Sequence, residues 1–195
     1  LNIFKIKNKI IYGLAKIEKE IKNNKILLSE KYEDIHMNIE KRLFQIIGEE
    51  AGYIHTARSR NDQIITDFKI WIKSSTREID HKIDKIIAST LKLAEKNIYT
   101  IMPGFTHLKN AQAISFAHYL LAYVEMFNRD KKRFENNLIS LNENPLGVAA
   151  LSGTTFNIDR NYTTKKLGFK KPTNNSIDTV SDRDFVLDFL YSISV

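Results

Sequence analysis

The sequence predicts an all-α protein dominated by long bundle helices, on the strength of three observations. The 195 residues include only seven glycines and three prolines, which favours long helices over a turn-rich β-protein. Hydrophobic residues recur at heptad spacing in one stretch, and at alternating three- and four-residue steps in another, as in a helical bundle seam. With 43% hydrophobic residues, the composition excludes a wholly disordered chain.

The longest helix is predicted from about Asp62 to Ile98. Such a helix spans about 55 Å at 1.5 Å per residue, so its apolar stripe needs equally long partners. Its stripe repeats every seven residues: Ile65, Ile72, Ile79, Ile86 and Leu93.

A second long helix is predicted from about Asn110 to Leu141, with a seam broken only at Lys131. Asn144-Pro145-Leu146-Gly147 ends this pattern. Shorter helices are expected at residues 10–22, from Asp34 as N-cap to Gly48, at 159–168, and from Ser176 or Asp178 onward; residues 48–60 are expected to be a loop.

Composition also narrows the classes of partner. The formal charge is +7, yet the lysines are scattered among glutamates without an arginine-rich run, which argues against nucleic-acid binding. No apolar run reaches the ~20 residues of a membrane span. The absence of cysteine excludes disulfides and thiolate metal sites and fits a reducing compartment, the cytoplasm.

Both ends resemble the interior of a longer protein. Leu1 is not an initiator methionine, and Val195 closes a helical pattern without a stop signal. We therefore expect a fragment in which residues 1–60 belong to an N-terminal helical domain, including a polar loop leading into the long helix. Residues 61–195 are expected to belong to the central bundle.

Met102–Gln112 interrupts the two long helical patterns. Pro103 and Gly104 predict that the first helix stops there, which leaves Thr106 and His107 on a short loop between two rigid helices. Histidine can exchange a proton near neutral pH, so His107 is a candidate acid–base group. The alternative is a helix connection whose histidine only caps or packs.

A polar loop, His55–Gln63, precedes the long helix. Ser59, Asn61 or Asp62 could cap that helix, which is the purely structural interpretation. Two arginines, Arg58 and Arg60, flank the serine, and guanidinium groups beside a helix N-terminus favour carboxylates. We therefore expect an anion site.

Asp34 and His36 form a third polar cluster, for which an N-cap with a first-turn histidine is the simpler interpretation. The histidines lack metal-ligand spacing, and no phosphate loop or dinucleotide fingerprint occurs.

Two of these stretches read HTARSRNDQ (residues 55–63) and MPGFTHLKNAQ (residues 102–112). Further blocks lie in residues 33–40, 144–147, 151–155, 158–160 and 181–185. In content and order they resemble argininosuccinate lyase over essentially the whole chain. The block at residues 58–62 separates that family from fumarase, aspartase and adenylosuccinate lyase, which share its fold.

The resemblance implies a bundle of the fumarase/aspartase type and a homotetramer whose active sites are shared between subunits. It implies cleavage of argininosuccinate to arginine and fumarate in arginine biosynthesis, with no cofactor and no metal. By the same resemblance His107 is the acid–base histidine. Substrate contacts are implied for Asn61, Thr106, Arg60, Ser59, Asp34 and His36.

A catalytic serine of the family lies on a loop reading Ser-Ser-x-Met-Pro-x-Lys, which residues 1–195 do not contain. We therefore expect the fragment alone to be inactive. Two alternatives stay open: another fumarate-releasing lyase of the superfamily, and a non-catalytic structural protein like the crystallins that resemble this family.

Overall fold

A computed structural model describes residues 3–26 and 29–195. The chain divides into two compact units, Leu1–Ala57 and Arg58–Val195, which are described separately. The prediction of an all-α fold is confirmed, since the strands present are short and paired two by two. Among the described residues no helix has the length and apolar character needed to cross a membrane.

The first unit packs α1 (Ile3–Lys22) against α2 (Ile35–Ile47) and the 3-10 helix η1 (Gly48–His55). Ile17, Leu43 and Ala51 form its buried centre. The helices approach closely at Gly13, where an added Cβ would lie 2.4 Å from the Leu43 side chain. A loop was predicted for residues 48–60, and the 3-10 helix over its first eight residues corrects that prediction.

Asp34 caps α2 as predicted, because its Oδ1 accepts a hydrogen bond from the backbone N–H of Met37 at 2.7 Å. Across the unit, the guanidinium of Arg42 donates two hydrogen bonds to the Glu20 carboxylate, at 2.8 and 2.7 Å. This contact lowers the pKa of Glu20. The ion pair therefore joins α1 to α2 beside their apolar contact.

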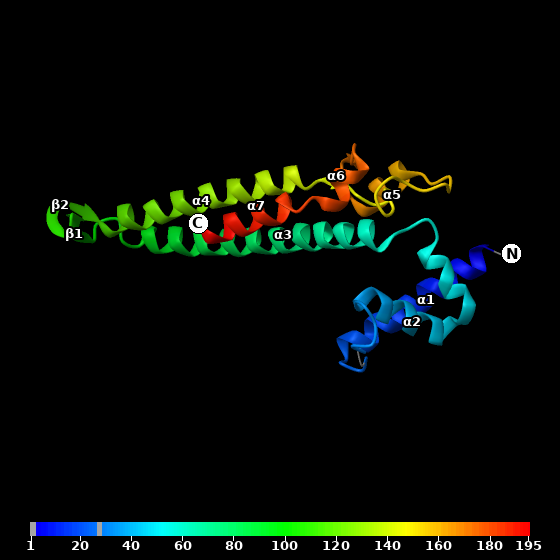
Figure 1. The fold of residues 1–195 in the computed structure, drawn as a ribbon. Helices are drawn as coiled ribbons and strands as arrows, with labels where there is room; N and C mark the ends of the chain where they lie inside the picture. Colours follow the sequence, from blue (N-terminus) through cyan, green and yellow to red (C-terminus); the bar gives the residue numbers. More distant parts are fainter. Residues whose placement is uncertain (1–2, 27–28) are drawn as a thin grey trace. The chain divides into compact units, whose positions relative to one another are not determined.

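The second unit is built on α3 (Arg60–Glu95, 36 residues) and α4 (Phe116–Ser140, 25 residues), which run side by side (Figure 1). α7 (Asp184–Ser194) packs along both helices. The core that they share contains these buried residues: Ile65, Ile72, Ile83, Phe134, Leu141, Phe185 and Phe189.

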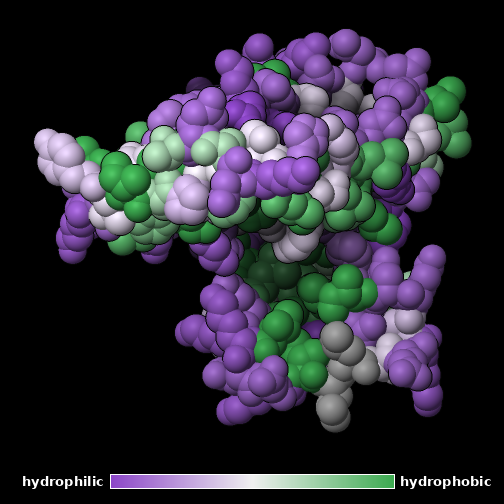
Figure 2. Space-filling model, turned by 90° about the vertical axis from the view of Figure 1, so that its left-hand side faces the viewer, coloured by the Kyte–Doolittle hydropathy of each residue, from purple (hydrophilic) through white to green (hydrophobic). Residues whose placement is uncertain are grey.

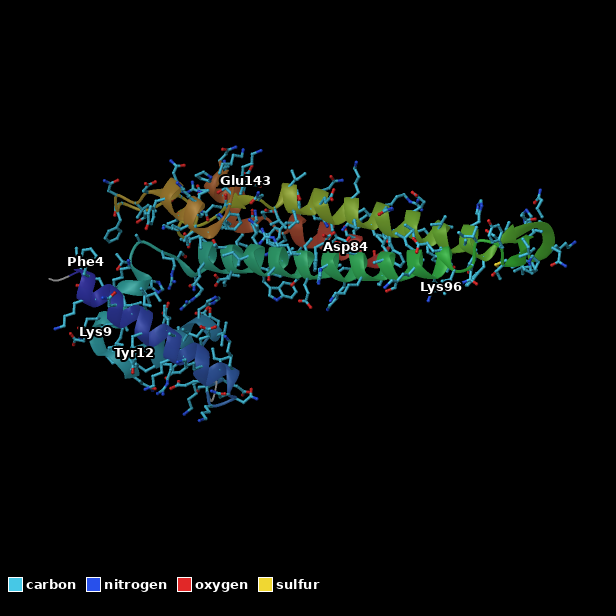
Figure 3. All side chains as sticks on the ribbon, turned by 180° about the vertical axis from the view of Figure 1, so that it is seen from behind. Phe4, Lys9, Tyr12, Asp84, Lys96 and Glu143 are labelled. Carbon is cyan, nitrogen blue, oxygen red and sulfur yellow. The ribbon has the colours of Figure 1, made fainter. Side chains whose placement is uncertain are left out.

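Lys131, which interrupts the seam of α4, is explained by a charged contact with α3. Its ammonium lies 3.0 Å from Asp80 Oδ1 and also contacts Asp84, which is labelled on the long helix in Figure 3. The hydrogen bond with Asp84 raises the pKa of Lys131. A polar position within the seam thus acquires two carboxylate partners.

The smaller elements of this unit follow α4. They are β3 (Glu143–Asn144), α5 (Arg160–Leu167), β4 (Lys171–Pro172), which pairs in parallel with β3, and α6 (Ser176–Ser181). The short helix predicted at 159–168 is confirmed, with Asp159 as its N-cap and Gly168 in the left-handed conformation at its end. The single helix expected from Ser176 onward is wrong, because the chain breaks at Asp182 and Arg183 into α6 and α7.

A buried lysine ties these elements to α3. Lys73 donates hydrogen bonds to Asn142 Oδ1 at 2.9 Å and to the Gly168 carbonyl at 2.6 Å, and its ammonium lies 4.5 Å from the centre of the Phe169 ring. Burial lowers the pKa of Lys73, and the charge of Arg77 adds to that effect. The contacts satisfy a cation that would otherwise be costly to bury.

The connection between α3 and α4 differs from the loop that the sequence predicted. It is an antiparallel hairpin of β1 (Ile101–Thr106) and β2 (Lys109–Ser115), so α4 begins at Phe116 instead of about Asn110. α3 ends at Glu95, three residues before the predicted end. The pairing of Ile101–Pro103 with Ala113–Ser115 satisfies backbone groups in a ladder, and this outweighs the helical spacing of Ala113.

The heptad stripe of α3 is covered along only part of its length. Ile65 and Ile72 are fully buried, whereas Ile86 and Leu93 are 45% and 44% exposed. Figure 2, which faces the hairpin end of the chain, shows hydrophobic residues at the surface of the molecule. The prediction that this stripe needs further long partners agrees with that exposure.

Candidate active site

The first part of the candidate site is the N-terminus of α3. Ser59 is the N-cap: its Oγ accepts a hydrogen bond from the Asn61 N–H at 3.2 Å. Asp62 completes a capping box, because its Oδ1 accepts from the Ser59 N–H at 3.1 Å. The structural interpretation of Ser59 as a cap is thus confirmed.

Asp62 makes a second set of contacts, with residues far away in the sequence. Its Oδ2 accepts hydrogen bonds from the backbone N–H groups of Gly147 at 2.9 Å and Ala149 at 2.8 Å. The side chain is completely buried. Beside it, Asn61 donates from Nδ2 to the Ala150 carbonyl at 2.9 Å. The α3 N-terminus and the segment Leu146–Ala150, which we call the 146–150 turn, therefore form one hydrogen-bonded unit.

Arg160 holds the other side of this turn. Its Nε donates to the Leu146 carbonyl at 3.3 Å, and its Nη2 donates to the Asn144 carbonyl at 3.1 Å. Burial lowers the pKa of Arg160, and the negative charge of Asp62 works in the opposite direction. The N–H groups of Gly147 and Ala149 thus face a carboxylate, while the carbonyl at the start of the turn faces a guanidinium.

These contacts refine the expected anion site. Fewer N–H groups at the start of α3 are available to an anion than the sequence predicted, because Ser59 and Asp62 already accept hydrogen bonds there. The candidate anion-binding groups that remain are Arg58 and Arg60, both half-buried, and the exposed Asn61. Arg60 donates from Nη1 to Gln63 Oε1 at 3.1 Å, which orients its guanidinium along the helix.

The second part of the candidate site is the hairpin tip. Thr106 ends β1, and His107 and Leu108 form the two-residue turn, with φ angles of 50° and 61°. Both Thr106 and His107 are exposed. Thr106 also lines a cavity of about 350 Å³ between the hairpin and the start of α4. The prediction that His107 lies in a short connection is confirmed, but this connection joins two strands instead of two helices.

Gly104 is required by this hairpin. An added Cβ would lie 2.6 Å from the Gln112 carbonyl oxygen, a backbone atom that cannot move without breaking the strand pairing. The register of the two strands also shifts at this point, between Pro103 and Phe105. The glycine therefore permits the irregular pairing that ends at Thr106 and His107.

The two parts of the site lie far apart within one chain. Ser59 and Asn61 stand at the start of α3, whereas the hairpin follows its end, and Figure 1 shows the hairpin at the opposite end of the long helices. A helix of 36 residues is about 54 Å long. A single chain therefore does not bring Asn61 together with Thr106 and His107.

Asp34 and His36 belong to the first unit. His36 Nδ1 lies 3.5 Å from Asp34 Oδ2, and the two side chains are 16% and 22% exposed respectively. The carboxylate is shared between capping α2 and contacting the imidazole. This arrangement agrees with a cap beside a first-turn histidine, and any contact of the pair with substrate stays a prediction.

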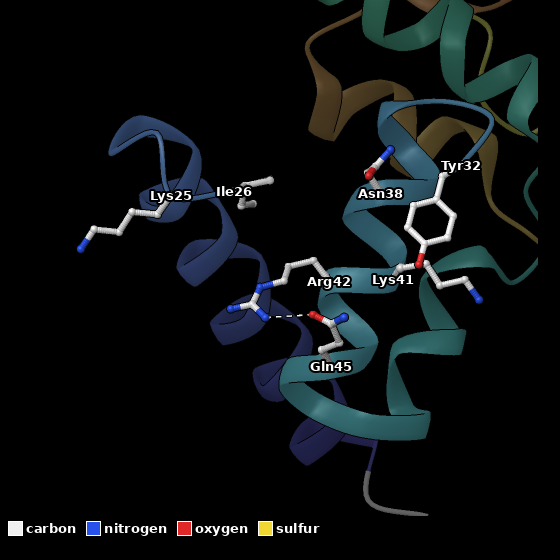
Figure 4. A pocket seen from close by; sticks show the side chains of 7 residues that line it. All are labelled: Lys25, Ile26, Tyr32, Asn38, Lys41, Arg42 and Gln45. Atoms are coloured by element: carbon white, nitrogen blue, oxygen red, sulfur yellow. Dashed lines mark hydrogen bonds between the residues drawn. The ribbon is translucent and has the colours of Figure 1, made fainter. Parts of the chain in front are cut away.

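The first unit also contains a cavity of about 280 Å³ lined by three cationic side chains. Its polar groups do not converge on a common point. Arg42 is bound to Glu20 and Gln45, and Figure 4 shows Lys25 and Lys41 pointing in opposite directions. This cavity therefore lacks the arrangement of a binding site for an anion.

Two residues that contact the 146–150 turn, Asp62 in α3 and Arg160 in α5, were not assigned to the site from sequence. Asp62 was considered only as a possible cap, and Arg160 only as part of a similar sequence block. Their common role depends on contacts across roughly 85 residues, such as that of Asp62 with Gly147. Nothing in local spacing indicates a contact of that range.

A comparison with known protein families assigns the chain to a class of proteins. It belongs to the lyase family, whose family model matches residues 2–195.

Two similar proteins show which lyases this chain resembles in sequence. The chain is 79% identical over 192 residues to the argininosuccinate lyase of Pelagibacter ubique, covering 98% of this chain and 42% of that protein. It is 54% identical over 182 residues to the argininosuccinate lyase of Chelativorans sp., covering 93% of this chain and 38% of the relative. The chain therefore spans about two fifths of the length of the relatives that it matches.

Solved structures agree on the fold. An EDDS lyase in complex with formate matches with a TM-score of 0.84 and 26% identity, over 97% of this chain and 37% of that one. A fumarate lyase:delta crystallin from Brucella melitensis, described as bound to cobalt, matches with a TM-score of 0.79 and 18% identity, over 96% and 46% of the two chains. The latter likeness concerns the fold alone. Together these matches place the chain in an all-α fold of the fumarase/aspartase type.

Proposed function

We propose that the whole protein to which this chain belongs is an argininosuccinate lyase, which cleaves argininosuccinate to L-arginine and fumarate in arginine biosynthesis. The observation that supports this proposal most is the 79% identity to the argininosuccinate lyase of Pelagibacter ubique over nearly the whole chain. The blocks at residues 58–62 and 102–112, on which the resemblance rests, lie at the two ends of α3.

The proposed reaction is a β-elimination. A base takes the proton from the carbon next to a carboxylate, the electron pair of that C–H bond forms the double bond of fumarate, and the C–N bond breaks. The guanidino nitrogen leaves with a proton from an acid. Negative charge builds up on the carboxylate in the transition state, so cations and hydrogen-bond donors aimed at its oxygens contribute most to the rate.

Different residues of this chain are proposed to carry out these tasks. Arg60 and Asn61 bind and stabilise the carboxylate at the α3 N-terminus, with Ser59 beside them. Thr106 orients a substrate oxygen, and His107 takes part in proton transfer together with the serine that the resemblance assigns to a loop outside residues 1–195. Asp34 and His36 are proposed as further substrate contacts, on the resemblance alone.

The functional assembly is proposed to be a homotetramer in the cytoplasm, working without cofactor or metal. About 54 Å of helix separates Asn61 from the hairpin in one chain, so a site that uses both takes them from different copies. The exposed heptad positions Ile86 and Leu93 supply apolar surface for helices of those copies.

An assay of the full-length protein tests the proposed substrate. Fumarate release is followed by its ultraviolet absorbance with argininosuccinate, aspartate or malate as the only substrate. We expect release from argininosuccinate alone. Release from aspartate or malate without release from argininosuccinate would reassign the protein within the superfamily, and no release from any of them would favour a crystallin-like structural role.

A further inference from the structure

Asp62 stands out among the buried charged groups, because one carboxylate connects the α3 N-terminus, which carries proposed substrate contacts, with the 146–150 turn. Oδ1 holds the Ser59 N–H, and Oδ2 holds two N–H groups of the 146–150 turn. With no exposed surface, Asp62 cannot touch a substrate directly. Any influence on binding must pass through the backbone that it holds.

The turn needs such an acceptor because its backbone is strained. Gly147 and Ala149 have φ angles of 100° and 53°, and a non-glycine residue in the left-handed region costs about 1 kcal/mol or more. Both N–H groups converge on the same carboxylate oxygen. Charge-assisted hydrogen bonds of this kind are about twice as strong as neutral ones, enough to hold the strained conformation.

The 146–150 turn also fixes the orientation of the Asn61 side chain. The residue after Ala149 presents its carbonyl to Asn61 Nδ2 at 2.9 Å, so the amide of Asn61 is held by the turn that Asp62 holds. The sequence of contacts therefore runs from Asp62 through Gly147 and Ala149 to the Ala150 carbonyl and then to Asn61.

We propose that Asp62 is a positioning residue, which fixes the 146–150 turn and through it orients Asn61 for the substrate. This inference rests on the proposed function. It goes beyond it by giving a role to a buried acid that does not meet the substrate, and by making the turn part of the site.

A double-mutant cycle in the full-length protein tests this proposal. Asp62→Asn keeps the shape of the side chain but removes the charge and one acceptor oxygen. We expect it to lower kcat/KM for argininosuccinate about 10- to 100-fold, because small displacements of substrate-positioning groups have effects of that size. In an Asn61→Ala background, the same substitution should change kcat/KM less than about 3-fold, since the group that it positions is already gone.

Asp182→Asn is the matched control. Asp182 Oδ2 lies 3.3 Å from the buried Lys69 ammonium of α3, so this variant also removes a carboxylate from an α3 contact. We expect it to lower the thermal midpoint and leave the effect of Asn61→Ala unchanged. An equal effect of Asp62→Asn in both backgrounds, or no effect in either, would overturn the positioning role.

A measurement without substrate separates this proposal from the proposed function. Hydrogen exchange of a peptide that contains Gly147 and Ala149 should be faster in Asp62→Asn than in the wild type, whether or not the protein cleaves argininosuccinate. Equal protection in the two proteins would overturn the proposal. A wild type that exchanges as expected but releases no fumarate would overturn only the proposed function.

Discussion

At the scale of single residues, His107 combines two properties that a proton-transfer group needs. It occupies an exposed turn between two paired strands, and its backbone is fixed at a φ of 50°. A side chain there can reach a substrate held by another element, while the strands keep its backbone in place. Its φ angle also determines which substitution can remove the imidazole without disturbing the turn.

We predict that His107→Asn in the full-length protein lowers turnover by about 10² to 10⁴ and leaves the assembly intact. Asparagine accepts left-handed backbone conformations, so the turn should persist and only the imidazole is lost. Leu108→Asn, at the neighbouring turn residue with a φ of 61°, is the control and should keep most of the activity. Near-normal turnover of His107→Asn would remove His107 from the mechanism.

Residue roles were predictable from sequence where the cause is local. Caps such as Asp34 and Ser59 act within three residues of themselves, and glycine at the end of a helix, as at Gly168, is a property of one position. The link between Asp62 and Gly147 depends on tertiary folding. Sequence spacing therefore indicated the caps and missed the contact that unites the site.

At the scale of elements, the hairpin between α3 and α4 was missed because its turn lacks the usual sequence signal. Two-residue turns of this kind favour Asn-Gly or Asp-Gly, whereas His107 and Leu108 adopt the positive φ angles here. The long helices were predictable because their apolar spacing persists over many turns. Their ends were not, since the strand pairing of residues 109–115 decides where α4 begins.

The hairpin predicts a strong effect of Gly104→Ala. The added Cβ would meet the Gln112 carbonyl at 2.6 Å, so the strands must separate or shift register. We expect a loss of stability of about 1–3 kcal/mol, seen in chemical denaturation, together with reduced turnover. Gly52→Ala is the control, because its Cβ would have no atom within 4 Å. Wild-type stability and turnover of Gly104→Ala would contradict the observed pairing.

The ion pair between α1 and α2 predicts a pH dependence. Because Arg42 lowers the pKa of Glu20 from 4.5, the folded state binds fewer protons there than the unfolded state. The stabilisation is therefore present above pH 4.5 and is lost as the pH falls through the lowered pKa.

Melting curves of the wild type and Glu20→Gln test this dependence. The variant should melt at a lower temperature at pH 7, and the difference should shrink below pH 4.5. Glu18→Gln, which removes an exposed pair with Lys22 on the same helix, should have a smaller effect at pH 7. A difference between wild type and Glu20→Gln that is constant from neutral to acid pH would show that the charge of Glu20 does not contribute.

At the scale of the whole molecule, two groups that are proposed to serve one reaction lie far apart in one chain. Asn61 lies in the first turn of a helix of 36 residues, and His107 follows the end of that helix. Both groups were indicated by the sequence, and the helix length alone predicts that they lie far apart. Copies of the chain that lie antiparallel to one another would bring the start of one long helix to the hairpin of another.

The most direct test of this claim mixes two impaired variants of the full-length protein. Asn61→Ala and His107→Asn are dissociated together, reassembled in equal amounts, and assayed for fumarate release from argininosuccinate. If a site takes Asn61 and His107 from different copies, random reassembly should restore about a quarter of the wild-type sites. Activity no higher than that of the separately reassembled parents would contradict the account, because every site would then draw both residues from one defective chain.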